Sequence, residues 1–171
     1  VIQHLEYYAH VVWPELDVHL VSVTEEWAGM ALAGPASRKL LEAVTDDIDV
    51  SNEACPFMAF RTGTIAGAPA RLFRISFSGE LAYEINVPAD YGMDVWQWIM
   101  NAGAHLGISP YGTEAMSILR IEKGHVVSGE INGRTTAGDL GFGSMLSTTK
   151  DYIGRHSLTR PALNDDGRKQ L

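Results

Sequence analysis

The sequence has a single cysteine and no hydrophobic run that approaches the length of a membrane-spanning helix. One cysteine, Cys55, excludes an internal disulfide framework and suits a reducing compartment, so we expect a cytoplasmic protein. A helix that spans a bilayer needs about 20 consecutive apolar residues, and no secretory signal pattern is visible. We therefore predict no association with a membrane.

Positive charge is also scarce. The 171 residues include 13 Lys and Arg against 21 Asp and Glu, which gives a formal net charge of −8. Non-specific affinity for nucleic acids or anionic lipids comes from basic patches. The charge balance therefore argues against a nucleic-acid partner, although it leaves room for a local basic pocket.

Motifs for metals, nucleotides and nucleophilic catalysis are missing as well. The six histidines, at positions 4, 10, 19, 105, 125 and 156, form no pair at metal-ligand spacing. Neither a Walker A sequence nor a dinucleotide-binding glycine fingerprint occurs, and no nucleophile elbow is found. The sequence therefore predicts no metal site and no flavin or nicotinamide site in this chain, and it identifies no catalytic residue.

The chain does have enough apolar side chains for a core, because hydrophobic residues make up 46% of it. Its length suits one good-sized domain. The sequence begins at Val1 inside a helical pattern and stops, at residues 168–171, in what resembles the start of a strand. We therefore expect a fragment that is truncated at both ends.

The strongest pattern covers residues 71–88. Polar and apolar residues alternate on both sides of Gly79-Glu80, as in two strands that each bury one face. The apolar members of the pattern are Phe73, Ile75, Phe77, Tyr83, Ile85 and Val87. This arrangement predicts an antiparallel hairpin in which Phe77 faces Tyr83 on the buried side.

On the polar side of this hairpin, opposite Ser76, the pattern places Glu84. A carboxylate held rigidly on a strand offers two coplanar acceptors, which match two parallel N–H donors. The edge of a pterin or guanine ring presents such a pair of donors. On spacing alone, an ordinary solvated strand residue is the favoured interpretation of Glu84.

The remaining segments predict an α+β fold, an antiparallel sheet with helices packed on one side. Helices are expected at 1–12, after Gly34-Pro35, at 89–106 and at 113–123, and further strands at 17–23, 28–33 and 57–65. The core stripe of the 89–106 helix is expected to consist of Met93, Trp96, Ile99 and Met100. We divide the chain into a compact core, 1–125, and an extended glycine-rich arm, 126–171, in which 151–158 packs back.

Four segments carry a family resemblance: ALAGPASRKLL (31–41), FRISFSGELAYEINVP (73–88), GTEAMSILRIEKG (112–124) and DLGFGSMLSTTKDYIGRHSL (139–158). In this order and spacing they resemble the tetrahydrofolate-binding aminomethyltransferase family, typified by the T-protein of the glycine cleavage system. In detail, SFSGE and SPYGTEAM are more similar to the C-terminal folate domain of sarcosine oxidase alpha subunits. The resemblance implies the fold of that family, including a ferredoxin-like subdomain.

The resemblance also implies roles for single residues. Glu84 matches the glutamate that binds the pterin ring, and Tyr83 either flanks that ring or belongs to the core. A folate-contacting arginine of the T-protein is replaced by Met116, which cannot donate to a ligand carboxylate, so this contact is lost or replaced. The family's catalytic aspartate would lie upstream of the first residue. Arg120 and Glu122 are expected to form an ion pair or a helix cap.

The function that the resemblance implies is the tetrahydrofolate-binding part of a heterotetrameric sarcosine oxidase. The partners would be the beta, gamma and delta subunits, and FAD, FMN and NAD would be bound outside this chain. The one-carbon unit of oxidised sarcosine would pass to tetrahydrofolate here, giving 5,10-methylenetetrahydrofolate and glycine, and the fragment alone is expected to be inactive.

Two alternatives stay open. The first is a docking module of the same fold that binds no folate, which Met116 favours. The second is a T-protein-like aminomethyltransferase that acts on a lipoyl carrier.

Overall fold

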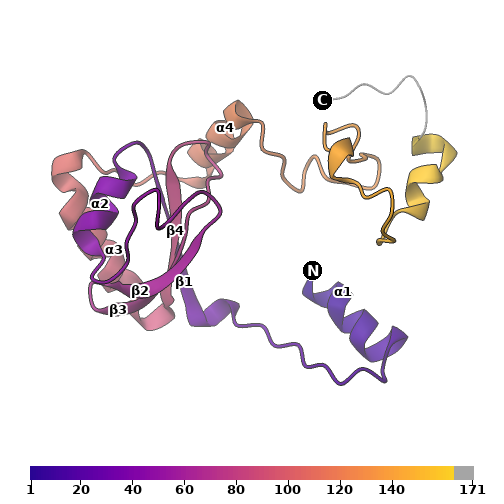
Figure 1. Ribbon diagram of the computed structural model, residues 1–171, viewed down its shortest axis with the longest axis horizontal. Helices are drawn as coiled ribbons and strands as arrows, with labels where there is room; N and C mark the ends of the chain where they lie inside the picture. Colours follow the sequence, from indigo (N-terminus) through magenta and orange to yellow (C-terminus); the bar gives the residue numbers. More distant parts are fainter. Residues whose placement is uncertain (164–171) are drawn as a thin grey trace. The chain divides into compact units, whose positions relative to one another are not determined.

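The computed structural model describes residues 1–163, and its centre is a four-stranded antiparallel sheet in the order β1-β4-β3-β2 (Figure 1). The strands are β1 (Trp27–Ala33), β2 (Phe60–Ile65), β3 (Ala68–Phe73) and β4 (Ala82–Pro88). Strand β4 therefore lies inside the sheet, paired with β1 along its whole length and with β3 at its middle residues, 84–86. Strand β1 is at one edge.

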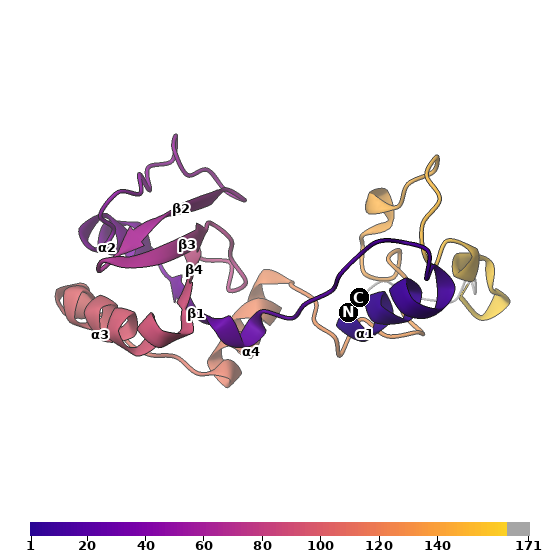
Figure 2. The same ribbon diagram turned by 90° about the horizontal axis from the view of Figure 1, so that it is seen from below.

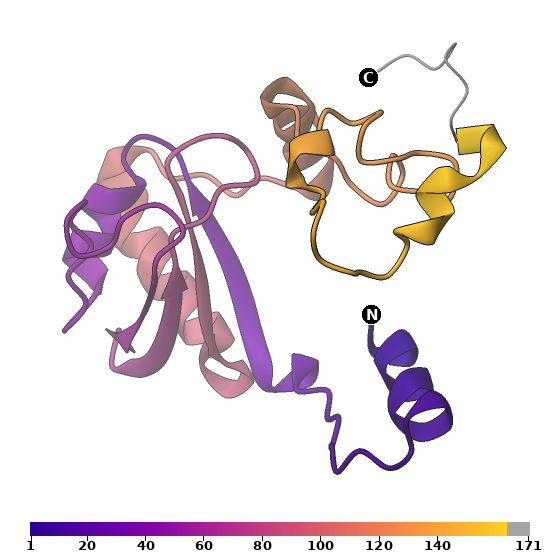
Figure 3. The ribbon, with the colours of Figure 1, turned by 45° about the vertical axis from the view of Figure 1, so that its right-hand side comes forward.

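Two helices, α2 (Ser37–Val44) and α3 (Gly92–Gly103), pack against one face of this sheet and against each other (Figures 1 and 2). Their buried residues meet the buried residues of the strands in one apolar core, which includes Leu40, Leu41, Val44, Leu72, Tyr83, Ile85, Val87, Val95 and Ile99. Figure 3 shows the opposite face of the sheet free of these helices. The predicted α+β architecture, an antiparallel sheet with helices, is confirmed.

The N-terminal helix forms as predicted, but it buries nothing within the described residues. Helix α1 (Ile2–Tyr7) continues into a π-helical turn, Tyr8–Val12, and none of the residues of either element is buried. The strand predicted at 17–23 is wrong, because these residues make no ladder and most of them are exposed. An apolar alternation does not become a strand without a partner to take its hydrogen bonds.

The β3–β4 connection differs from the predicted hairpin. The strands are joined by residues 74–81, and Phe73, not Ser76, lies opposite Glu84. The buried face of β3 carries Ala68, Ala70 and Leu72 rather than the larger aromatic series. The predicted register, with Phe77 opposite Tyr83, is therefore wrong, whereas the predicted faces of β4 are confirmed.

The register of β3 follows from the turn before it. Residues Ala66 and Gly67 connect β2 to β3, and both have positive φ, 52° and 74°. A two-residue loop with positive φ at both positions is the hairpin turn that matches the twist of the strands. It places Phe60 opposite Phe73 and Arg61 opposite Leu72, which turns Leu72 towards the helices.

Helix α3 is present, and of its predicted core stripe Ile99 alone is buried. A 3-10 turn precedes it and another, Ala104–Leu106, follows it, so the helical range is confirmed. Its buried residues are Val95, Ile99 and Gly103, while Met93 is 66% exposed. A Cβ on Gly103 would lie 2.9 Å from atoms of Ile108 and Leu40, so the glycine marks the face that packs most closely.

The last helix, α4 (Thr113–Lys123), ends at Gly124, whose φ of 83° is the left-handed conformation typical of a helix stop. Contacts divide the chain into a first unit, 1–119, and a second unit that begins at Arg120. From residue 125 to 163 the second unit contains turns and 3-10 segments, one of which is His156–Thr159. The strand expected at 168–171 lies outside the described residues.

Candidate functional site

Glu84 lies in the middle of the sheet face that the helices leave uncovered. Its strand partners are Ala31 on β1 and Phe73 on β3. The side chain is exposed, and no hydrogen bond or ion pair holds it within residues 1–163. The small side chain of Ala31 leaves space beside the carboxylate. Glu84 is thus an accessible acceptor on a rigid strand, as the alternation predicts.

The neighbouring long side chains of this face are engaged with one another instead of with Glu84. The guanidinium carbon of Arg71 lies 3.6 Å from the ring centroid of Trp27, a cation–π contact. Phe60 and Phe73 pack with 4.8 Å between their ring centroids. Among residues 1–163, Arg71 forms no ion pair with Glu84.

A cavity of about 260 Å³ opens beside Glu84. Its walls come from β1, β4, the 74–81 connection and the region of α4, through Ala31, Ala33, Ile75, Phe77, Ser78, Ala82, Tyr83, Glu84, Tyr111 and Met116. These walls are mainly apolar or aromatic, with one carboxylate and one serine hydroxyl. Such a cavity suits a flat ring that presents hydrogen-bond donors at one edge.

The serine of this cavity has an unusual environment. Ser78 is 9% exposed, and its Oγ has no hydrogen-bond partner among the described residues. The other buried serine, Ser37, donates from its Oγ to the carbonyl oxygen of Leu81 over 3.0 Å. Ser78 therefore carries the buried hydroxyl whose hydrogen-bonding capacity the folded chain leaves unused.

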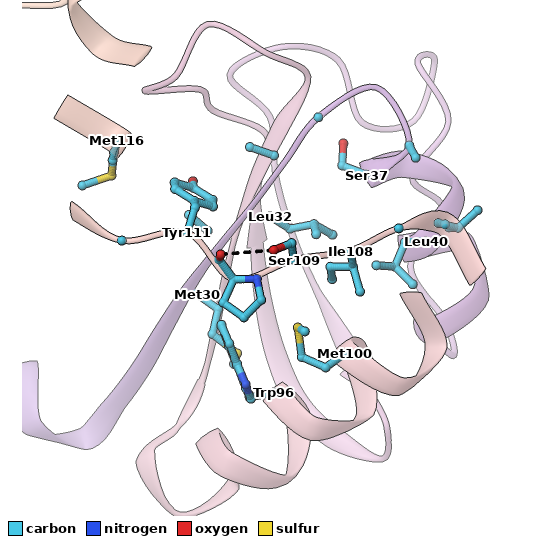
Figure 4. A pocket seen from close by; sticks show the side chains of 18 of the residues that line it. Met30, Leu32, Ser37, Leu40, Trp96, Met100, Ile108, Ser109, Tyr111 and Met116 are labelled. Carbon is cyan, nitrogen blue, oxygen red and sulfur yellow. Dashed lines mark hydrogen bonds between the residues drawn. The ribbon is translucent and has the colours of Figure 1, made fainter. Parts of the chain in front are cut away.

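A second, larger cleft of about 730 Å³ runs along β1 (Figure 4). Its side chains come from β1, α2, α3 and residues 106–116, and the labelled ones are Met30, Leu32, Ser37, Leu40, Trp96, Met100, Ile108, Ser109, Tyr111 and Met116. Ser109 Oγ is 3.4 Å from the carbonyl oxygen of Pro110. The cleft shares Ala31, Ala33, Tyr111 and Met116 with the smaller cavity.

Tyr83 is fully buried, and its side chain belongs to the helix-facing side of β4. Its hydroxyl accepts a hydrogen bond of 3.0 Å from Arg38 Nε, and Arg38 also donates to Asn52 Oδ1 over 2.8 Å. Tyr83 thus anchors the strand that carries Glu84. Its assignment as a residue that flanks a pterin stays a prediction.

Arg120 forms an ion pair, as the sequence predicts, but its partner is Glu130 instead of Glu122. The Val127 N–H donates to the Glu130 carboxylate over 2.7 Å, and this bond lowers the pKa of Glu130, with a further contribution from Arg120. Met116, where the resemblance expects an arginine, lines both cavities of the first unit. The methionine that stands in place of the family's arginine is therefore a wall residue of the candidate site.

Two residues of the site, Tyr111 and Ser78, could not be identified from the sequence. Tyr111 and Ser78 become cavity residues through the path of two loops, which periodicity does not describe; the glycines that flank 107–112 are the only signal. The walls of both cavities, within residues 1–163, include no Lys or Arg. In the same residues no three His, Cys, Asp or Glu side chains gather in a metal-binding arrangement, and no helix is long and apolar enough to span a membrane.

Comparison with known proteins adds independent evidence. The chain is 49% identical over 174 residues to sarcosine oxidase subunit alpha of Rhizobium meliloti, a match that covers 100% of this chain and 18% of that protein. It is 36% identical over 143 residues to an aminomethyltransferase of Halothermothrix orenii, covering 82% of this chain and 39% of that protein. Mitochondrial dimethylglycine dehydrogenase of Homo sapiens is 32% identical over 145 residues, covering 83% of this chain and 17% of that protein.

These similarities confirm the resemblance to sarcosine oxidase alpha subunits and to aminomethyltransferases. The chain spans less than a fifth of the length of the sarcosine oxidase relatives. A family model described as the GCVT N-terminal domain matches residues 1–150. Because this match covers most of the sequence, the chain belongs to the GCVT N-terminal domain family.

Proposed function

We propose that this chain is the tetrahydrofolate-binding part of a sarcosine oxidase, with the pterin ring bound in the cavity beside Glu84. The observation that carries the proposal is the Glu84 carboxylate, which has no partner within residues 1–163 and lies on a strand at the wall of a mainly apolar cavity. A carboxylate accepts from the pterin N3–H and 2-amino groups together, as a two-point contact. The apolar walls are suited to the faces of the ring.

The larger cleft supplies a path for the rest of the ligand. It shares walls with the cavity at Tyr111 and Met116 and is mainly apolar, which suits the p-aminobenzoyl ring. The absence of Lys and Arg from these walls within residues 1–163 means that the glutamate carboxylates of folate would be held by groups outside them. This agrees with a methionine at position 116 in place of the family's arginine.

In the proposed reaction, sarcosine is oxidised at a flavin in another part of the assembly. The one-carbon unit then passes to tetrahydrofolate, and 5,10-methylenetetrahydrofolate and glycine are the products. The contribution of this chain is positional: it orients the acceptor and excludes water from the transfer. The similarity to sarcosine oxidase alpha subunits supports partnership with further subunits of such an enzyme.

Two finer assignments belong to the same proposal. The ferredoxin-like subdomain rests on the family resemblance and on the antiparallel sheet with helices α2 and α3 on one face. Within residues 1–163, the element order β1-α2-β2-β3-β4-α3 lacks the helix that the β-α-β-β-α-β motif places before its last strand. The single cysteine, which is buried and free, supports a cytoplasmic location.

The experiment that tests the proposal is a titration of the full-length protein, with its subunits, by 5-formyltetrahydrofolate, a reduced folate that resists air oxidation. Glu84→Gln replaces one of the two acceptors by a donor and removes the charge. We expect a loss of affinity of about tenfold to a hundredfold, the value of charge-assisted hydrogen bonds. Glu80→Gln, an exposed glutamate of the adjoining connection that lines neither cavity, is the matched control and should bind like the wild type. Equal affinities for Glu84→Gln and Glu80→Gln would overturn the assignment of Glu84.

A docking module without folate is the second candidate function. The large exposed apolar side chains at the N-terminus, including Val11, Trp13, Leu16 and Val21, favour it, as does Met116. The two functions differ in one measurement. Tetrahydrofolate added to the full-length enzyme during sarcosine turnover suppresses formaldehyde release if the one-carbon unit is captured, so a release equal to that of the Glu84→Gln enzyme with the same tetrahydrofolate would favour the docking module.

A further inference from the structure

We propose that the hydroxyl of Ser78 is a second polar contact for the ligand of the Glu84 cavity, donating to an acceptor on the bound ring. This inference rests on the proposed function, because the ligand is the pterin ring assigned to that cavity. It adds to Glu84 a donor on the same cavity wall, and it makes Ser78 a ligand-binding residue in its own right.

Within residues 1–163, the Ser78 side chain is buried without a partner. Ser78 is 9% exposed, and its Oγ lacks a hydrogen-bond partner among the described residues. Leaving a buried hydroxyl without a partner destabilises a folded chain, because the group loses its bonds to water and gains none. An alanine at this position would avoid that loss. The position of the serine in the fold is therefore unfavourable unless something outside the chain bonds to it.

Ser78 lies at the wall of the cavity. Ser78 lines the same cavity as Glu84, Phe77 and Ile75. Among the described residues, the other wall residues with a hydroxyl group are Tyr83 and Tyr111. The Tyr83 hydroxyl is already bonded to Arg38, and Tyr111 is 40% exposed, whereas Ser78 is buried. Ser76, two residues before Ser78, accepts from the Gly79 N–H over 2.9 Å and lines neither cavity. The unbonded hydroxyl of Ser78 thus lies at the cavity, whereas the hydroxyl of Ser76 has a hydrogen bond within the loop.

Glu84 and Ser78 have complementary hydrogen-bonding properties. A carboxylate accepts only, whereas a serine hydroxyl both donates and accepts. A pterin ring presents two donors, N3–H and the 2-amino group, next to a carbonyl oxygen at C4. Glu84 matches the donors, and Ser78 is suited to the carbonyl. The pair therefore fits a heterocycle with a donor–donor–acceptor edge, and Ser78 would select for the acceptor.

The test measures ligand affinity and stability on the same full-length variants. Ser78→Ala is expected to weaken binding of 5-formyltetrahydrofolate by about three- to tenfold, the effect of one neutral hydrogen bond. In the absence of ligand the same variant should unfold at the same temperature as the wild type or at a higher one, because it removes an unpaired buried group. Ser76→Ala is the control: its lost loop bond should lower the unfolding temperature and leave the affinity unchanged. Ser78→Thr, which keeps the hydroxyl, should retain more affinity than Ser78→Ala.

The outcomes separate this inference from the function on which it rests. If Glu84→Gln weakens binding while Ser78→Ala binds like the wild type, the Ser78 inference is overturned and the folate proposal stands. If Ser78→Ala lowers the unfolding temperature of the unliganded protein without a change in affinity, the hydroxyl has a structural role and the inference is again overturned. A wild-type protein that does not bind 5-formyltetrahydrofolate overturns both.

Discussion

Arg120 and Glu130 form an ion pair at the end of α4, with 2.9 Å between Nη1 and Oε2. The same Arg120 nitrogen donates to the carbonyl oxygen of His125 over 3.1 Å. The Glu130 carboxylate also accepts from the Val127 N–H over 2.7 Å. These bonds join the last turn of the helix to the chain that follows it, and Glu130 is the acceptor on which two of them depend.

Acidification is expected to loosen this connection. The folded chain holds the pKa of Glu130 below its ordinary value of 4.5, first through the Val127 N–H and then through Arg120. A lowered pKa means that the carboxylate stabilises the fold above pH about 4.5, and that this contribution is lost as the pH falls through the folded-state pKa. Hydrogen–deuterium exchange of residues 120–131, corrected for the intrinsic pH dependence of exchange, should therefore accelerate in acid.

Two variants make the measurement specific. Glu130→Gln should show fast exchange in this segment already at neutral pH, with little further change in acid. Glu122 lies on α4, as Arg120 does, but is not part of the ion pair, so Glu122→Gln should behave like the wild type. Exchange in Glu130→Gln that matches the wild type at neutral pH would show that the ion pair does not hold the segment.

The register of β3 makes a prediction about stability. Leu72 is fully buried, whereas Phe77 is 37% exposed. Leu72→Ala should therefore lower the free energy of unfolding by about 2–5 kcal/mol through the cavity that it leaves in the core. Phe77→Ala should cost about 1 kcal/mol or less, because its side chain is largely outside that core. Urea unfolding of the two variants, followed by tryptophan fluorescence, measures both values. A larger loss for Phe77→Ala would favour the hairpin in which Phe77 faces Tyr83.

The difference between β3 and β4 shows which part of the fold the sequence could predict. In β4 one set of alternate residues is large and apolar and the other is polar, so only one orientation buries the apolar set. In 68–77 both sets contain apolar residues, and the larger aromatic set is not the buried one. The pairings decide between them: the Ala66-Gly67 turn places Ala68 opposite Ile65, and Leu72 lies opposite Ile85 of β4, so the smaller set shares the face of these two buried residues.

In the candidate site, too, the residue on a strand could be predicted and the residues on loops could not. The alternation of β4 placed Glu84 on the uncovered face, and this position is confirmed. The cavity beside it is built from residues 75–78 and 111–116, which are brought together by loops. Loop paths depend on backbone conformations and on tertiary contacts that have no period in the sequence, so Ser78 and Tyr111 could not be predicted. In α3, likewise, a glycine at 103 decides the packed face more than the size of Trp96 or Met93 does.

The turn that sets the register can itself be improved. Ala66 has a φ of 52° and is exposed, and a left-handed conformation costs an alanine about 1 kcal/mol relative to residues that adopt it readily. Asparagine followed by glycine is the preferred sequence for this two-residue turn. Ala66→Asn is therefore expected to raise the free energy of unfolding by about 0.5–1 kcal/mol, measured by urea denaturation.

Gly67→Ala should change stability in the opposite direction. A Cβ at position 67 would meet no atom within 4 Å, so any loss comes from the φ of 74° and not from a clash. We expect a loss of about 1 kcal/mol, the cost of placing an alanine in the left-handed region. If both turn residues have positive φ, Ala66→Asn must raise the free energy of unfolding and Gly67→Ala must lower it. Two neutral variants would mean that the turn does not adopt this conformation, and the physical reason given for the buried face of β3 would be lost with it.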